Sequence, residues 1–252
     1  GQANLTILSG NIGNNAIFGD NSFNVVEVRN AGAERIVIDG FRVTQGNANA
    51  GSPNRRKRGG GIYVARSNVD VKNCNVINNY CEDNGGGIYA FRSEISIVNC
   101  TSNNNTAGLN GGGIFINRCE ADMSDVTANG NLAVNIAGGI FFGRSNIDVL
   151  NLTLSQNDAD QGGGLYATRS SGDIVQALMT ENAASNAGNA IQINNCNPLR
   201  LINSTIADNF GAGLATVQVS NNTTRLSILN SILWNEASEI SAPTATVNAA
   251  FS

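Results

Sequence analysis

The sequence predicts an all-β fold, namely a right-handed, single-stranded parallel β-helix of about eight coils with about 26 residues in each coil. Three observations predict it. A glycine-rich motif recurs at a nearly constant spacing, an asparagine recurs at the same spacing, and apolar residues alternate with polar ones over short runs. Such a period is typical of solenoids, in which each coil buries its apolar side chains against its neighbours.

The glycine-rich motif consists of a glycine triplet, then Ile or Leu, then an aromatic residue. Its five copies occupy residues 59–63, 85–89, 111–115, 137–141 and 162–166, where Ala137 replaces one glycine. The asparagine series continues further, through Asn79, Asn105, Asn131, Asn157, Asn182, Asn209 and Asn235. We therefore expect a single β-helix domain over residues 1–252, with regular coils at 59–210 and less regular coils at 1–58 and 211–252.

Short apolar runs supply the strands of each coil. Alternation with a period of two indicates strands, whereas helices need longer runs with a period of 3.6. One coil contains three such runs, which are Ile62 with Val64, Val69 with Val71, and Cys74 with Val76. The alternation is interrupted at one column, where we expect a left-handed turn whose amides bond from coil to coil. That column contains Asn73, Asn99, Asp125 and Asn151.

Composition argues against several classes of protein. The chain has 15 basic and 19 acidic side chains, a net charge of −4 and a pI near 4.8, so we expect no nucleic-acid partner. No stretch approaches the roughly 20 apolar residues of a membrane helix, so we expect no membrane insertion. Gly1 is not followed by an export signal, which we expect to have been removed or to lie outside this sequence.

The number of cysteines excludes a framework in which every cysteine forms a disulfide within the chain. Five is an odd number, so at least one thiol has no internal partner. Cys74 and Cys100 share one repeat position and are expected to be small core residues. The pattern assigns no role to Cys81, Cys119 or Cys196.

The repeats resemble those of secreted bacterial right-handed parallel β-helix repeat proteins, including the group with a choice-of-anchor domain, and more loosely the polymorphic outer-membrane repeat. Besides the glycine triplets, the matching segments are Thr6–Gly10, Asp39–Phe41, Leu154–Asn157, Ile206–Asn209 and Asn230–Asn235. The resemblance covers nearly the whole chain and implies export, followed by display or release outside a bacterial cell. Such proteins include adhesins, uncharacterised surface proteins and polysaccharide-degrading enzymes, so the resemblance implies fold and location rather than one activity.

Two columns that should face outward supply the candidate ligand-binding residues. The first, the aromatic ladder, directly follows each Ile or Leu of the motif and contains Tyr63, Tyr89, Phe115, Phe141 and Tyr166. The second, the arginine ladder, lies four residues after the same Ile or Leu and contains Arg66, Arg92, Arg118, Arg144 and Arg169, with Arg29 as a candidate sixth member. Stacked rings stabilise neighbouring coils, and a flat aromatic strip also suits a sugar chain or a protein surface.

The arginine ladder needs a neutralising partner, because like charges about 4.8 Å apart on neighbouring strands repel one another. Two partners are open at this point. One is an internal lattice of acids, formed by Asp70, Asp122 and Asp148 with Glu94 and Glu120 nearby. The other is an external anion, since guanidinium groups bind carboxylate and sulfate through paired hydrogen bonds.

Catalysis is the less favoured interpretation. The chain contains no His, which excludes His-based triads and most zinc sites, and we assign no catalytic residue, metal or cofactor. The acidic turns 82–84 and 158–160 are weak candidate ligands for Ca²⁺. The basic segment Arg55–Arg58 is expected to be a solvated loop. An enzyme acting on acidic polysaccharide, either a lyase or a glycoside hydrolase, is the alternative.

We therefore expect an extracellular or bacterial cell-surface module with an adhesive or structural role. The expected partner is an anionic polysaccharide or an anionic protein surface. Self-association of the β-helix, head-to-tail or lateral, is a further expectation, because the repeat pattern shows no obvious polar cap at either end.

Overall fold

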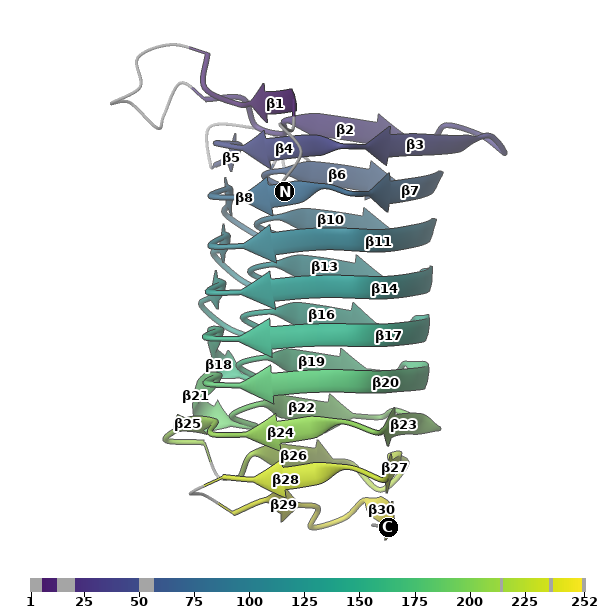
Figure 1. Cartoon of the computed structure of the whole chain (residues 1–252), viewed down its shortest axis with the longest axis vertical. Coiled ribbons are helices and arrows are strands. Elements are labelled where there is room, and N and C mark those ends of the chain that lie inside the picture. The colour runs from purple at the N-terminus through teal and green to yellow at the C-terminus, as the bar shows by residue number, and fades with distance from the viewer. Residues whose placement is uncertain (1–5, 13–20, 50–56, 214, 236–237, 251–252) are drawn as a thin grey trace.

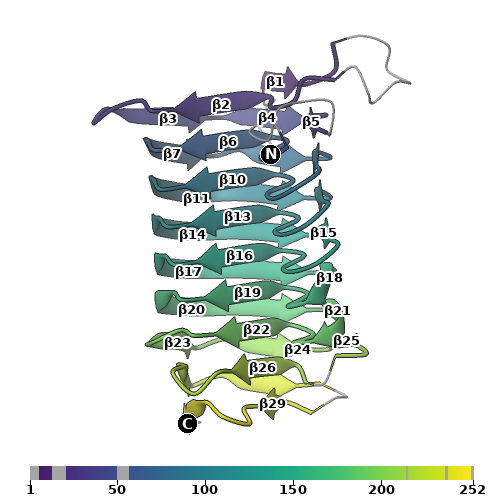
Figure 2. The same cartoon turned by 180° about the vertical axis from the view of Figure 1, so that it is seen from behind.

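The computed structural model confirms the predicted parallel β-helix. It describes residues 6–12, 21–49, 57–213, 215–235 and 238–250. In this part of the chain, short strands wind into stacked coils, and every strand pairs in parallel with its copy in the next coil (Figure 1 and Figure 2). No helix in these residues is long and apolar enough to cross a membrane.

Three parallel sheets run the length of the β-helix. The main path of sheet A follows β1 (Thr6–Ser9), β4 (Phe41–Thr44), β8 (Asn75–Ile77), β11 (Glu94–Asn103), β14 (Glu120–Asn129), β17 (Asn146–Ser155), β20 (Ser171–Thr180), β23 (Leu199–Ile202), β27 (Arg225–Leu229) and β30 (Thr246–Ala250). Four shorter strands also belong to sheet A: β3 (Arg35–Asp39), β7 (Asn68–Lys72), β24 (Thr205–Ala207) and β28 (Ile232–Trp234).

Sheets B and C complete each coil. Sheet B contains β2 (Val26–Arg29), β6 (Ile62–Ala65), β10 (Ile88–Phe91), β13 (Ile114–Asn117), β16 (Ile140–Gly143), β19 (Leu165–Thr168), β22 (Ile191–Asn194), β26 (Val217–Ser220) and β29 (Ile240–Ser241). Sheet C contains β5 (Asn47–Ala48), β9 (Tyr80–Cys81), β12 (Thr106–Ala107), β15 (Leu132–Ala133), β18 (Asp158–Gln161), β21 (Ala183–Ala187) and β25 (Phe210–Gly211).

The core is a continuous bore filled by columns of like residues. In the bore, Val71 stands in register with Ile97, which stands in register with Met123, and all three side chains are fully buried. The predicted runs differ from the structure in one respect. The runs around Val69 and Val76 belong to a single sheet, sheet A, and the third sheet is the unpredicted sheet C, whose shortest strands have two residues.

Two asparagine ladders mark turns, and the outer one was predicted. In the outer ladder, Asn73 and Asn99 have φ values of 50° and 51°, and Asn99 Nδ2 donates to Asn73 Oδ1 over 2.7 Å. The inner ladder is the asparagine series that follows the repeat, and its amides lie inside the corner between sheets A and C. Here Asn105 Nδ2 donates to Asn131 Oδ1 over 3.2 Å, and the backbone N–H of Asn105 donates to the same oxygen over 2.9 Å.

Cysteine replaces serine at two positions of the column that directly follows the arginine ladder and its continuation at Asn195. This column contains Ser67, Ser93, Cys119, Ser145, Ser170 and Cys196, all of them buried. Each side chain donates to the carbonyl two residues earlier, as Ser145 Oγ does to Gly143 over 3.0 Å and Cys119 Sγ does to Asn117 over 3.4 Å. The structure therefore gives Cys119 and Cys196 the turn-closing role of a serine.

Cys119→Ser is expected to leave the free energy of unfolding within about 0.5 kcal/mol of the wild type, because a hydroxyl makes the same hydrogen bonds. Ser145→Val is expected to lower it by about 2 kcal/mol, because the buried N–H of Cys119, which donates to Ser145 Oγ over 3.1 Å, then loses its acceptor. Chemical denaturation of both variants measures the difference. Equal losses in the two variants would contradict this role for the column.

The remaining thiols are also buried. Cys74 and Cys100 stand on neighbouring coils in the bore, as predicted, and the backbone N–H of Cys74 lies 3.4 Å from Cys100 Sγ. The closeness of the two thiols lowers the pKa of Cys74 and, together with burial, raises that of Cys100. Cys81 packs in sheet C between Ala48 and Ala107, and burial raises its pKa.

Candidate functional site

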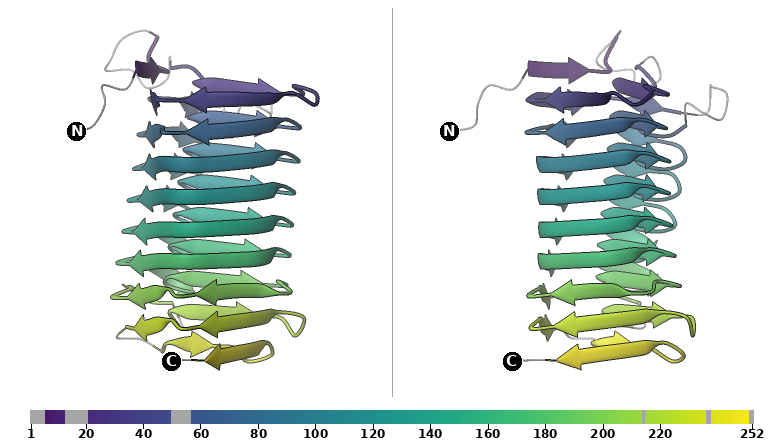
Figure 3. Two further views of the ribbon diagram at one scale, coloured as in Figure 1. Left: turned by 45° about the vertical axis from the view of Figure 1, so that its right-hand side comes forward. Right: turned by 90° about the vertical axis from the view of Figure 1, so that its right-hand side faces the viewer.

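The arginine ladder stands on the turn that leads from sheet B into sheet A, along the edge that faces the viewer in the right-hand panel of Figure 3. All five side chains are exposed. All five residues also adopt the left-handed conformation, with φ between 51° and 58°. This conformation costs free energy for most L-residues and is most easily adopted by Gly and Asn.

The same turn is built with asparagine in the coils that flank the ladder. The register places Asn30 beside Arg66, and Asn195 beside Arg169, with φ values of 52° and 58°. Arg29, the candidate sixth member, is therefore not part of the ladder. It lies in β2, where its guanidinium pairs with Glu27 and covers the ring of Tyr63. The turn itself does not require Arg.

The internal lattice of acids does not form around the ladder. Within the described residues, none of the five arginines lies within 4.0 Å of a carboxylate. Asp70 pairs instead with Lys72 and Arg35, and Arg35 also contacts Glu94. Burial raises the pKa of Asp70, but hydrogen bonds from Lys72 and Arg35 outweigh it and hold that pKa below its usual value.

The ladder borders a groove on the surface of the β-helix. The groove has a volume of about 420 Å³ and is lined by Arg92, Arg118 and Arg144 together with Glu94 and Glu120. The guanidinium carbons of Arg92 and Arg118 also lie 5.1 and 5.9 Å from the ring centroid of Phe91. Cation–π contact restrains these two side chains without neutralising their charge. Three arginines of the ladder thus border the groove as charged groups.

The acids form a separate strip on the outer face of sheet A. Asp122 stands in register with Asp148, and Asp148 with Asp173. A second groove, of about 390 Å³, runs over this strip. The closeness of Asp122 and Asp148 follows from the coil register, which would bring any two residues of a column together.

The aromatic ladder lies outside the bore but is buried. Its rings stack with centroids 4.5 to 5.8 Å apart, and each residue is only 3 to 9% exposed. The chain packs closely against the base of these side chains: a Cβ on Gly85 would lie 2.8 Å from Cβ of Tyr89. The rings therefore form a second small core, and they present little surface to a ligand.

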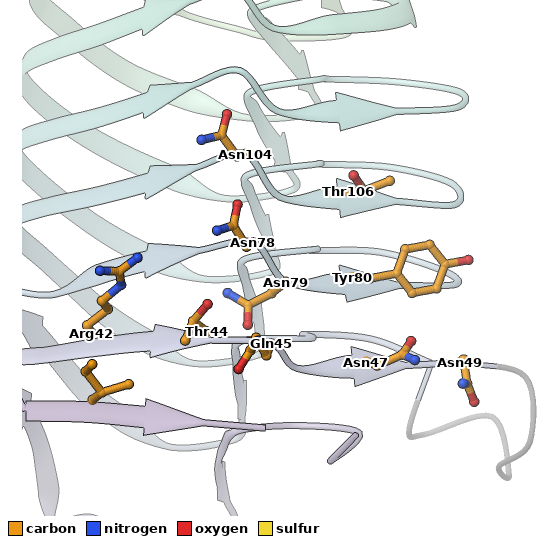
Figure 4. Close-up of a pocket in the computed structure, with 11 residues that line it drawn as sticks. Arg42, Thr44, Gln45, Asn47, Asn49, Asn78, Asn79, Tyr80, Asn104 and Thr106 are labelled. Carbon is orange, nitrogen blue, oxygen red and sulfur yellow. The ribbon is translucent and has the colours of Figure 1, made fainter. Parts of the chain in front are cut away.

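A larger groove lies on the opposite edge of sheet A, at its corner with sheet C, and the sequence did not predict it. This corner groove has a volume of about 1090 Å³. Figure 4 shows Arg42, Asn78 and Asn104 on its sheet A side and Tyr80 and Thr106 on its sheet C side. The available signal was the doubled Asn78-Asn79, since one of two adjacent residues at a turn must face outward.

Comparison with known proteins identifies one family. Residues 36–241 match the family described as NosD, periplasmic copper-binding protein. A search of curated proteins and a search of solved structures each found no match.

The residues do not fit a copper site. Protein copper sites use His, Cys and Met side chains, and the chain has no His. Among the described residues, no group of three or more His, Cys, Asp and Glu side chains is placed to hold a metal ion. The neighbouring thiols Cys74 and Cys100 lie in the bore, where they donate to backbone carbonyls. Met123 and Met179 are also fully buried in the bore.

Proposed function

The chain belongs to the NosD family of periplasmic copper-binding proteins, and from this premise we propose that it acts outside the cytoplasm as a binding module. The proposed ligand is a linear anionic polysaccharide, held along the arginine ladder. The observation that carries the proposal is the contrast within one column. Arg occupies five consecutive coils at a turn for which the flanking coils use Asn.

The cost of the ladder supports this proposal. At each of the five ladder positions, Arg rather than Asn adopts the left-handed backbone conformation. Successive charges of the same sign also stand about one strand spacing, or about 4.8 Å, apart. Both features disfavour the folded chain. An anion bound along the ladder would offset the repulsion. Ligand binding would therefore account for the five arginines, which packing does not explain.

The regular spacing favours a polymer with regularly spaced charges. One sugar of an extended 1,4-linked chain is similar in length to the coil spacing, so a polyuronate carries about one carboxylate for each rung. Guanidinium groups bind carboxylates through paired hydrogen bonds. An acidic protein surface would present carboxylates at irregular spacing and would match fewer rungs.

The test replaces the three central arginines of the ladder with Asn, the residue that stands at this turn in the flanking coils. The triple variant combines Arg92→Asn, Arg118→Asn and Arg144→Asn. We expect the wild type to bind polygalacturonate with an affinity that falls as salt rises. The triple variant should bind at least about tenfold more weakly, from about 0.5 to 1 kcal/mol for each lost contact. Its melting temperature should equal or exceed that of the wild type, because the repulsion is relieved. Affinity electrophoresis and calorimetry give the two readouts.

A single replacement outside the ladder provides the control. Arg225→Asn makes the same change of charge as Arg118→Asn, but Arg225 lies at the start of β27, two coils beyond the last residue of the arginine ladder. Only the ladder variant should weaken binding. Equal effects of the two, or no binding of polygalacturonate at all, would reject the proposal. Binding of polyglutamate without polygalacturonate would assign the ladder to an acidic protein instead.

A further inference from the structure

The corner groove differs from the arginine ladder in position and in chemistry. The arginine ladder precedes the strands of sheet A, whereas Asn78 and Asn104 follow β8 and β11 at the other end of the same strands (Figure 4). The groove extends over neighbouring coils, from β4 and β8 of sheet A to β9 and β12 of sheet C. Any ligand in it would therefore run along the axis of the β-helix.

Five polar side chains that line the groove have unused hydrogen-bonding capacity. We call Arg42, Asn78, Tyr80, Asn104 and Thr106 the corner set. No side chain of this set makes a hydrogen bond or an ion pair to the rest of the described chain, in contrast to the neighbouring Asn79, whose amide makes four hydrogen bonds. Several polar groups with unused hydrogen-bonding capacity in a groove of this size are a common feature of ligand sites.

The two amides of the corner set differ from those of the outer asparagine ladder. In the outer ladder, Asn99 and Asn73 stand one coil apart and bond to each other over 2.7 Å. Asn78 and Asn104 also stand one coil apart and both have a left-handed backbone, with φ of 55° and 54°, yet their amides do not bond to each other. Each amide thus keeps a donor and an acceptor for a ligand.

The opposite wall adds an aromatic ring. Tyr80 is half-buried in β9, in register with Thr106 in β12, and its hydroxyl has no partner in the described chain. Further along the same column stand Leu132 and then Asp158. The wall therefore offers one ring and two hydroxyls, and the column then becomes apolar at Leu132 and acidic at Asp158.

We propose that the corner groove is a second binding site, which takes a short stretch of a polysaccharide mainly through its hydroxyl groups, with one uronic acid carboxylate at Arg42. Amides that both donate and accept suit neighbouring sugar hydroxyls, and the Tyr80 ring offers a face for sugar C–H groups. Among the described residues that line the groove, Arg42 is the one cation, which fits one carboxylate and not a dense polyanion. This site does not depend on the arginine ladder.

Calorimetry with two matched probes tests the site. Hexagalacturonate carries carboxylates, and its methyl ester keeps the sugar chain without the charge. We expect both to bind the wild type. In the triple ladder variant, which no longer binds hexagalacturonate at the arginine ladder, the added double change Asn78→Gly and Tyr80→Ala should weaken both probes by about tenfold or more. Glycine keeps the left-handed turn, so circular dichroism should be unchanged. Arg42→Gln should weaken only the hexagalacturonate.

The arginine ladder supplies the control for this experiment. The ladder variant with Arg92, Arg118 and Arg144 replaced by Asn should bind the methyl ester as the wild type does. The proposed corner site would be wrong if neither hexamer binds the wild type. It would also be wrong if the ester binds the variant with the double change as tightly as it binds the wild type, and both conclusions hold whether or not the arginine ladder binds a ligand. If the ladder variant alone loses the ester, the hydroxyl-binding site lies at the ladder and the inference is also wrong.

Discussion

Replacing Asn131 with alanine is expected to lower the free energy of unfolding by about 4 kcal/mol, because several buried polar groups lose their partners together. Asn131 is 1% exposed. Its Oδ1 accepts from the backbone N–H and the amide of Asn105 over 2.9 and 3.2 Å. Its Nδ2 donates to the carbonyl of Ser102 over 2.8 Å and to Asn157 over 3.0 Å. Equilibrium unfolding in guanidinium chloride measures the loss.

The outer asparagine ladder provides a matched comparison. Asn99 bonds to Asn73 on the surface, where water can replace the partner. Asn99→Gly keeps the left-handed backbone and should cost less than about 1 kcal/mol. A similar loss in the two variants would mean that burial of the inner ladder contributes nothing to stability, and that the loss at Asn131 has another cause.

Gly112→Ala is expected to destabilise the β-helix by about 3 kcal/mol or more, because the new methyl group has no room. A Cβ on Gly112 would lie 2.4 Å from the carbonyl oxygen of Leu132 and 2.6 Å from that of Gly138. Both obstacles are backbone atoms that belong to the stacking of one coil on the next. The coils would have to separate locally, so the melting temperature measured by circular dichroism should fall.

Gly40→Ala separates this overlap from the conformational preference of glycine. Gly40 has a φ of 77°, and a Cβ there would have no atom within 4 Å. The substitution should therefore cost only about 1 to 2 kcal/mol, from the left-handed backbone alone. A loss at Gly40 as large as that at Gly112 would show that crowding between coils is not the cause.

The columns of the fold were predictable from the sequence because every coil repeats the same physical requirements. The register of Ile62, Ile88 and Ile114 follows directly from the period, and the left-handed turn at Asn99 follows from the break in alternation. Sheet C was missed because strands such as Tyr80–Cys81 have two residues, too few to show a period.

The candidate site was less predictable, because a repeat gives the column of a residue but not what covers it. Tyr89 lies outside the bore, yet its ring is stacked between those of Tyr63 and Phe115 and the residue is buried, which composition alone does not reveal. The internal lattice of acids also failed for a reason of geometry, since Asp70 contacts Arg35 and Lys72 rather than the ladder. The corner groove depends on the side chains Asn78 and Tyr80 from two different sheets.

The exchange of Arg and Asn at one turn has a consequence for how such a protein changes over generations. Asn30 and Asn195 show that the backbone of a rung is the same with or without the charge. A single substitution can therefore add or remove one rung while the rest of the coil stays in place. The number of arginines in the ladder, and with it the length of the shortest ligand that contacts all of them, can change by one at a time without a new fold.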